Sequence, residues 1–256
     1  MIAHATIERE LALFVTNSGL PPEDVTDALT LQAAAQTVPR LLDLARAVRS
    51  SAAVPVTPMS SYEHATEAEL GTLLREHGSD KSTGHNYHLF YSSILGPRRT
   101  EALNVFEVGL GSNHLDVTGN MGECAKPGAS LRAFRDFLPR AHVYGADIDR
   151  RILFTEDRIK TYFVDQTDPA SFGPLELELP ALDLIIDDGL HCTHTNLATA
   201  AFAVRKLRSR GWLVVEDIRE SSLPIWHLAA LILPRESWRT SVVAGQWGWL
   251  FVAERV

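Results

Sequence analysis

From residue 104 onward, short continuous runs of hydrophobic residues alternate with segments of helical spacing. The hydrophobic runs are NVFEV, HVYGADI, TYFVD, LDLIIDD and GWLVVEDI. Helical spacing is found between them in SLRAFRDFL, in a short segment near 150–160 and near 193–209. Strands buried on both faces read as continuous Val, Ile and Leu runs, and strands connected through helices pair in parallel. The pattern therefore predicts a doubly wound α/β domain.

The end of the chain has a different pattern. Two strand-like runs, RTSVVAG and WLFVAERV, are joined by GQWG, which leaves no room for a helix between them. This spacing predicts an antiparallel hairpin. We therefore expect a mostly parallel, seven-stranded sheet closed by a C-terminal hairpin. A dinucleotide dehydrogenase differs because its second half repeats the βαβ pattern.

The beginning of the chain is predicted to be helical. Residues 2–17 and about 23–50 have helical spacing, and the breaker Gly19-Leu20-Pro21-Pro22 separates them. The stretch SSAAVPVTPMSS that follows is rich in small residues and proline, which is typical of a connector. We expect a helical segment over 1–60, acting as a lid or in homo-oligomerisation, and a main domain over 61–256.

Composition and charge exclude several classes of protein. The chain has 256 residues, 45% hydrophobic and 22% charged, with a formal net charge of −8 and no long run of Lys or Arg, so nucleic acid is not an expected partner. Cys124 and Cys192 are too few for a disulfide framework and too far apart for a Cys-x-x-Cys motif. The sequence has no signal-peptide pattern and no apolar stretch of the roughly 20 residues that a membrane helix needs. These features predict a soluble, cytoplasmic protein.

The first hydrophobic run leads into two glycines, Gly109 and Gly111, at the point where doubly wound sheets bind their ligands. A pyrophosphate would require a helix to begin directly after the glycines, so that its N-terminus meets the anion. Here the helix is expected only at KPGASLRAF, with Pro127 at its first position. The loop fits a ligand without phosphate, such as S-adenosylmethionine. The alternative is that the glycines only permit a tight turn.

Acids follow the next two predicted strands. Asp147 follows HVYGA, where a carboxylate can accept hydrogen bonds from both ribose hydroxyls of such a ligand, and Asp149 is a second candidate for that role. Asp165 follows TYFV, where adenine would lie. Each of these aspartates could instead cap a helix.

A second group of acids follows the fourth and fifth strands. Asp187-Asp188 and Glu216-Asp217 end LIIDD and LVVED, and these strands should be neighbours about 5 Å apart. Four unpaired carboxylates would repel one another, and a divalent cation such as Mg²⁺ would relieve this repulsion. His191 is a candidate general base, and His194 is a weaker one. The alternatives are that the acids cap helices or bind Lys and Arg, and that His191 is a surface residue.

With these residues in view, the chain resembles the metal-dependent sugar O-methyltransferases of macrolide tailoring, of the mycinamicin and macrocin type, and the related cephalosporin-methoxylation proteins. The resemblance covers roughly 79–218. It depends on a series of motifs that occur in the order of that family: SDKSTGHNYHLFY, FEVGLG, KPGASLRAFRDFLP, VYGADID, VDQTD, LIIDDGLH and GWLVVEDI.

The resemblance implies a class I methyltransferase fold, S-adenosylmethionine as the methyl donor, Mg²⁺, and a sugar or polyol hydroxyl of a natural product as the acceptor. It implies His191 and Asp187 as catalytic residues and Asp187, Glu216 and Asp217 as metal ligands. The implied cofactor-binding residues are Glu107, Gly109, Gly111, Ser130, Asp147, Asp165 and Asp187, together with Tyr87, which would help to close the site.

Two departures from the family pattern stand out. Gly111 is followed by a long insertion, SNHLDVTGNMGECA, and Leu190 stands where the family has a small polar residue. Read alone, DKSTGHNYHLFY is a polar turn before a helix, either a solvated loop or a lid that supplies Lys81, His85 and Tyr87.

Three other functions remain alternatives to a metal-dependent O-methyltransferase. They are a metal-independent N- or O-methyltransferase, a non-catalytic cofactor-binding subunit of the same fold, and a nicotinamide oxidoreductase. The site carboxylates argue against the second, and the delayed helix and the closing hairpin argue against the third.

Overall fold

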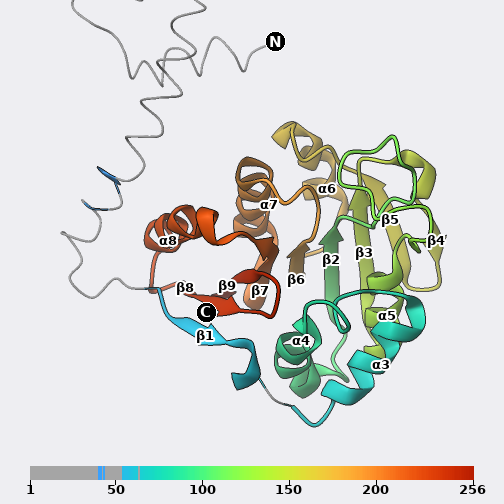
Figure 1. The fold of residues 1–256 in the computed structure, drawn as a ribbon, viewed down its shortest axis with the longest axis horizontal. Helices are drawn as coiled ribbons and strands as arrows, with labels where there is room; N and C mark the ends of the chain where they lie inside the picture. Colours follow the sequence, from blue (N-terminus) through green and yellow to red (C-terminus); the bar gives the residue numbers. More distant parts are fainter. Residues whose placement is uncertain (1–39, 42, 44–53, 63) are drawn as a thin grey trace, which may run out of the picture.

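The computed structural model describes residues 40, 41, 43, 54–62 and 64–256, and its centre is a mixed β-sheet (Figure 1). Among these residues the sheet has nine strands in the order β1-β8-β9-β7-β6-β2-β3-β5-β4. The strands are β1 (Val56–Pro58), β2 (Asn104–Val108), β3 (His142–Asp147), β4 (Thr155–Glu156), β5 (Ile159–Phe163), β6 (Leu182–Asp187), β7 (Leu207–Ile218), β8 (Trp238–Ala244) and β9 (Trp249–Arg255).

The strand directions confirm the predicted fold class. β2 pairs in parallel with β3 and β6, β3 pairs in parallel with β5, and β6 pairs in parallel with β7. β9 lies between β7 and β8 and is antiparallel to both, so the C-terminal hairpin is present. The short strands β1 and β4 extend the predicted seven-stranded sheet at its two edges.

Helices cover both faces of the sheet (Figure 1). On one side lie α3 (Glu67–His77), α4 (Tyr87–Leu95) and α5 (Ala129–Phe137), and on the other lie α6 (Gly173–Glu178), α7 (Thr193–Lys206) and α8 (Leu223–Ile232). Short 3₁₀ turns are η1 (Met59–Ser61), η2 (Gly96–Arg98), η3 (Arg150–Ile152), η4 (Pro169–Phe172) and η5 (Glu220–Ser222). None of the helices described is both long and apolar enough to cross a membrane.

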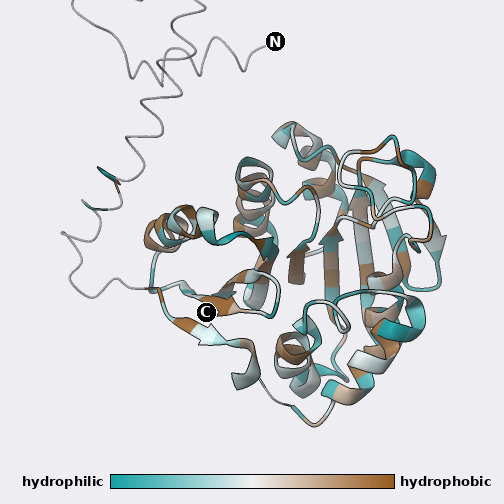
Figure 2. Ribbon diagram, in the orientation of Figure 1, coloured by the Kyte–Doolittle hydropathy of each residue, from teal (hydrophilic) through white to brown (hydrophobic). Residues whose placement is uncertain are grey.

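Each face of the sheet has its own hydrophobic core. Successive residues of β2 point to opposite faces, so Val105 packs in the core under α3, α4 and α5, and Phe106 packs in the core under α6, α7 and α8. Figure 2 shows the central strands as predominantly hydrophobic and the helices as mixed. Full burial of such a side chain contributes about 1.5–3 kcal/mol to the stability of the folded state. Packing in the two cores thereby fixes the positions at which the strands end.

Several local expectations differ from the structure. The connector SSAAVPVTPMSS contains strand β1, which pairs with β8, so part of it belongs to the sheet. The helix after the glycine loop is delayed as expected, but it begins at Ala129 with Gly128 as its N-cap rather than with Pro127 at its first position. The segment near 150–160 has only a 3₁₀ turn followed by β4. The helices predicted over 2–17 and 23–50 lie almost wholly outside the described residues.

Candidate active site

A cavity of about 760 Å³ opens at the carboxyl ends of the parallel strands. Its wall includes residues that follow β2, β3, β5 and β6, and it reaches Asp217 near the end of β7. Ligand sites commonly have volumes of about 300–1,000 Å³, and a doubly wound sheet places them at this edge. The predicted site residues that line the cavity are Gly109, Gly111, Ser130, Asp147, Asp165, His191 and Asp217.

The glycine loop is shaped by a close approach between two segments of backbone. Gly109 has φ +95°, and a Cβ at this position would lie 2.0 Å from the carbonyl oxygen of Asp188. Gly111 has φ +76°, and a Cβ there would lie 3.3 Å from Met121 in the inserted segment. Glycine is therefore required at 109 because the loop after β2 crosses directly against the loop after β6.

Asp147 supports this loop from the end of β3. One carboxylate oxygen accepts a hydrogen bond from the backbone N–H of Leu110 at 2.8 Å, and the other accepts one from the N–H of Asp149 at 2.8 Å. Asp149 accepts a hydrogen bond from the Ser112 hydroxyl at 2.7 Å and is paired with Arg151. Burial raises the pKa of Asp147, whereas the hydrogen bond from Arg151 lowers that of Asp149. Asp147 keeps its predicted place in the cavity wall, and Asp149 lies beside it.

Gln166 lines the cavity, and its side chain pairs with Asp187, which is buried behind the cavity wall. The Gln166 amide donates to both oxygens of Asp187 at 3.1 Å and to the Thr199 hydroxyl at 2.9 Å. The Gln166 carbonyl accepts from the N–H of Leu190 at 3.0 Å. Asp165 lines the cavity, and its carboxylate accepts hydrogen bonds from the following turn. Asp187 therefore fixes the loop after β6 through Gln166.

Asp188 points to the other side of the strand end. Successive side chains of a strand alternate between faces, so Asp187 and Asp188 diverge although they are neighbours. Asp188 Oδ2 lies 2.5 Å from the Lys81 ammonium, and Asp188 Oδ1 faces His191 Nε2 at 3.9 Å. The structure thus places Asp188, and not the predicted Asp187, among the converging acids.

The end of β7 is irregular where the next two acids occur. The pairing of β7 with β9 shifts register between Val215 and Ile218, and Asp217 has φ +54°. Such bulges re-aim side chains, and a positive φ in a residue other than glycine is common at functional sites. Here Glu216 is buried and points inward, while Asp217 reaches the cavity wall.

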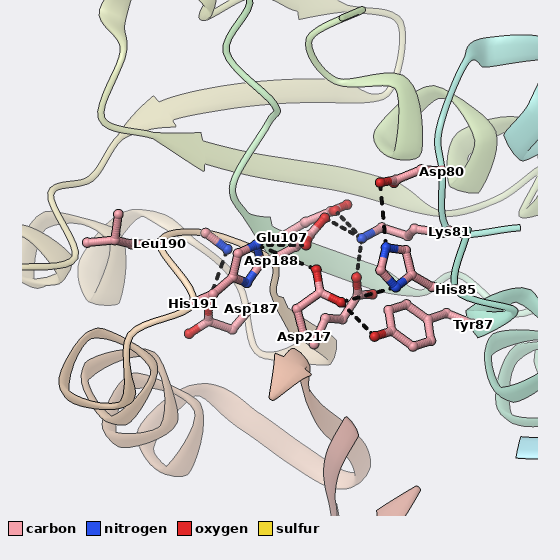
Figure 3. A network of polar contacts seen from close by, with 12 residues as sticks. Asp80, Lys81, His85, Tyr87, Glu107, Asp187, Asp188, Leu190, His191 and Asp217 are labelled. Carbon is pink, nitrogen blue, oxygen red and sulfur yellow. Dashed lines mark hydrogen bonds and ion pairs between the residues drawn. The ribbon is translucent and has the colours of Figure 1, made fainter. Parts of the chain in front are cut away.

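Lys81 lies at the centre of the inner acids, as Figure 3 shows. Its ammonium contacts Glu216 Oε2 at 2.5 Å and Glu107 Oε1 at 3.2 Å, in addition to Asp188. Burial alone would lower the pKa of Lys81, but the carboxylates, led by Asp188, raise it well above its usual value. Burial also raises the pKa of Glu107 to about 7 and that of Glu216 well above its usual value. The DKSTGHNY segment therefore supports the acids from within and does not form a surface loop at Lys81.

Tyr87 and His85 hold Asp217 from the same segment. The Tyr87 hydroxyl donates to Asp217 Oδ1 at 2.6 Å, and His85 Nδ1 lies 3.4 Å from the same oxygen. Burial and the nearby Asp217 raise the pKa of Tyr87. Tyr87 is only 1% exposed, so its hydroxyl positions Asp217 rather than closing the cavity.

Three donors remain directed outward: Asp188, His191 and Asp217. One ligand atom from each lies within 4.8 Å of the others, a spacing that could hold a metal ion. His191 Nε2 is 3.6 Å from Asp217 Oδ2, and His191 has φ +55°. Two carboxylates with an open cavity beside them fit a hard divalent cation that keeps water ligands.

The structure thus brings together part of the predicted site. Four predicted residues are buried behind the cavity wall: Tyr87, Glu107, Asp187 and Glu216. His194 lies at the exposed start of α7. The sequence did not predict two further residues of the site. Gln166, in VDQTD, donates a hydrogen bond to Thr199, and Tyr91, in DKSTGHNYHLFY, donates one to Glu216.

Comparison with known proteins gives several relatives of one kind. The chain is 34% identical over 155 residues to the 8-demethyl-8-alpha-L-rhamnosyl tetracenomycin-C 2'-O-methyltransferase of Streptomyces olivaceus, over 60% of this chain and 39% of that protein. It is 31% identical over 134 residues to the demethylmacrocin O-methyltransferase of Streptomyces fradiae, over 52% of this chain and 32% of that protein. The chain therefore spans between about a third and two fifths of the length of these relatives. No family model matches it.

A solved structure agrees with these relatives. MycE methyltransferase from the mycinamycin biosynthetic pathway, in complex with Mg and SAH, superposes with a TM-score of 0.52 at 26% identity, over 60% of this chain and 41% of that chain. A second crystal form of MycE has a TM-score of 0.59 at 22% identity and supports the fold. The chain is thus a homologue of the sugar O-methyltransferases of macrolide and tetracenomycin tailoring, with a Rossmann-like methyltransferase fold.

Proposed function

We propose that this protein transfers a methyl group from S-adenosylmethionine to a hydroxyl of a sugar or glycosylated natural product, with Mg²⁺ as a second cofactor. The observation that carries the proposal is a single cavity whose wall contains both the glycine loop after β2 and the outward donors Asp188, His191 and Asp217. A donor with a positively charged sulfur and an activated acceptor oxygen must meet in one such place.

The cavity wall supplies a place for each part of the cofactor. The loop at Gly109 and Gly111 would face its methionine end, Asp147 its ribose and Asp165 its adenine, with Ser130 nearby on the same wall. Glu107 would act through Ser130, whose hydroxyl donates to Glu107 Oε2 at 2.8 Å. These assignments are those predicted from the sequence, with one difference: Glu107 would support the wall from behind rather than contact the cofactor.

Asp188 and Asp217 would hold the cation, because magnesium prefers oxygen ligands. A bound divalent cation lowers the pKa of an acceptor hydroxyl and fixes its orientation. His191 Nε2, beside both carboxylates, would accept the proton of the acceptor hydroxyl. Glu216, predicted as a third ligand, has both oxygens engaged by Lys81 and Tyr91 and supports the site from behind.

The test is methyl transfer from S-adenosylmethionine carrying a labelled methyl group. Acceptors follow the relatives' names: a rhamnosylated tetracenomycin, demethylmacrocin and mycinamicin VI. We expect label in the sugar of at least one acceptor, loss of transfer in EDTA, and recovery with Mg²⁺. Transfer that survives complete chelation would favour the metal-independent alternative. The absence of any calorimetric response to S-adenosylhomocysteine would contradict both the metal-dependent and the metal-independent methyltransferase.

A further inference from the structure

The Lys81 side chain is only 2% exposed, and three carboxylates surround its ammonium. Glu107 comes from β2, Asp188 directly follows β6, and Glu216 lies in β7. The contacts are 3.2, 2.5 and 2.5 Å, respectively. The three carboxylates, which we call the inner cluster, therefore point at one position, and Lys81 Nζ occupies that position.

An arrangement of this kind is stable only with its cation in place. Buried carboxylates without a counter-charge are strongly unfavourable, and removal of one partner from a buried ion pair leaves the other charge uncompensated. Oxygen ligands converging at 2.3–2.6 Å are also typical of calcium sites. The Lys81 Nζ distances to Asp188 and Glu216, both 2.5 Å, fall in this range, whereas the distance to Glu107 is longer at 3.2 Å. The oxygens of the inner cluster thus converge on a position that a cation can occupy.

We propose that Lys81 is the resident cation of the inner cluster and a positioning residue for Asp188. The ammonium holds Asp188 Oδ2, which leaves Oδ1 directed toward His191. Tyr87 holds Asp217 Oδ1 in the same way, which leaves Oδ2 directed toward His191. The segment from Lys81 to Tyr87, which ends at the first residue of α4, thus aims both outward carboxylates from behind.

The inner cluster also reaches the cofactor wall. Lys81 contacts Glu107, and Glu107 accepts a hydrogen bond from Ser130, which lines the cavity. Lys81 itself is buried beneath this wall, so it acts through the carboxylates. The role of Lys81 in methyl transfer rests on the proposed function, whereas its role as resident cation does not.

The first test is thermal unfolding in EDTA at pH 8.5, where Glu107 is ionised. Lys81→Met keeps the aliphatic stem and removes the charge, and we expect the Tm to fall by about 10 °C. Glu107→Gln should raise the Tm of Lys81→Met by clearly more than it changes the Tm of the native protein, because in Lys81→Met it removes a charge that has lost its partner. A Glu107→Gln substitution that shifts the Tm by the same amount in both backgrounds would overturn the proposal. If Lys81→Met does not fold, the double variant should, and an unfolded double variant would also count against the proposal.

A matched control is available on the surface. Lys160 and Glu178 lie at the same 2.5 Å separation, but their side chains are 50% and 48% exposed. Lys160→Met and Glu178→Gln, singly and together, should change the Tm by little and in an additive way, because exposed ion pairs contribute little.

The second test uses Mn²⁺ alone. Lys81→Ala leaves the converging oxygens without an occupant, so this variant should bind at least one more equivalent of Mn²⁺ than the native protein, as counted by electron paramagnetic resonance. If Lys81→Ala binds no more Mn²⁺ than the native protein, the inner cluster is not a cation site. Both tests measure stability or Mn²⁺ binding and do not require methyl transfer. Their results therefore test the role of Lys81 even if the proposed function is wrong.

Discussion

Asp187 and Asp188 are adjacent in the sequence but act in different parts of the molecule. Asp187 is fully buried against Gln166, whereas Asp188 faces Lys81 and His191. The motif LIIDDGLH predicts that both acids converge at the site, and the resemblance implies Asp187 as the ligand, but only Asp188 joins the converging acids. Which of the two acids does so depends on the residue at which β6 ends, because a shift by one position exchanges the two faces.

The first prediction compares these two acids. Asp188→Asn should weaken Mn²⁺ binding by about 100-fold or more, since even residues behind the ligands of a metal commonly contribute about 10- to 100-fold. Asp187→Asn should leave Mn²⁺ affinity unchanged, because its side chain faces Gln166. Electron paramagnetic resonance measures both affinities. The opposite ranking would restore Asp187 as the ligand.

The second prediction separates the two possible roles of His191. If the cation is held by oxygen and His191 accepts a proton, His191→Gln should abolish methyl transfer and leave Mn²⁺ affinity nearly unchanged. Its position within 4.8 Å of the other donors also permits ligation. A large loss of Mn²⁺ affinity in His191→Gln would make this residue a ligand instead.

The third prediction concerns pH and Glu107. Burial raises the pKa of this carboxyl from 4.5 to about 7, so the folded state binds more protons than the unfolded state between these values. The stability that this group contributes is therefore fully present below pH 4.5 and is lost as the pH rises through 7. Urea unfolding from pH 5 to 8 should show a shallower decline in Glu107→Gln. An unchanged slope would mean that Glu107 titrates as in the unfolded chain.

Seven of the nine strands described were predicted, because each of them contains a hydrophobic run of strand length. The short edge strands β1 and β4 were not predicted, because they contain no such run. The same runs predicted where the site acids lie, because these acids stand at the carboxyl ends of the strands. Three features were not predictable: the bulge that turns Asp217 outward, the exact start of α5 and the approach of Gly109 to Asp188. Each depends on contacts between segments far apart in the sequence. The inward position of Lys81 was not predictable either, because it depends on carboxylates from three separate strand ends.

The fourth prediction tests the crossing of the two loops. Gly109 and Gly122 both have positive φ, at +95° and +81°, but a Cβ at 122 would meet nothing within 4 Å. Gly122→Ala should therefore lose only about 1 kcal/mol of unfolding free energy, from backbone strain. Gly109→Ala should lose several times more, together with most of its affinity for S-adenosylhomocysteine. Equal losses in chemical denaturation would show that the close approach is unimportant.

The whole sheet brings two kinds of chemistry to one edge. Residues at or after the ends of β2, β3 and β5, together with Ser130 of α5, form the wall assigned to the cofactor. Asp188, directly after β6, and Asp217, in β7, are the acids directed outward. The N-terminal helices, their role as a lid or in oligomerisation and the domain boundary near residue 60 stay predictions. Light scattering of the full chain measures the oligomeric state directly.

The central claim is that the methyl donor and the divalent cation bind side by side. It is tested most directly by NMR relaxation of S-adenosylmethionine labelled with ¹³C in its methyl group, with Mn²⁺ as the cation. The structure predicts strong paramagnetic relaxation of the bound methyl carbon, which disappears in Asp188→Asn although the cofactor still binds. A methyl carbon that binds without any relaxation from Mn²⁺ would contradict the account.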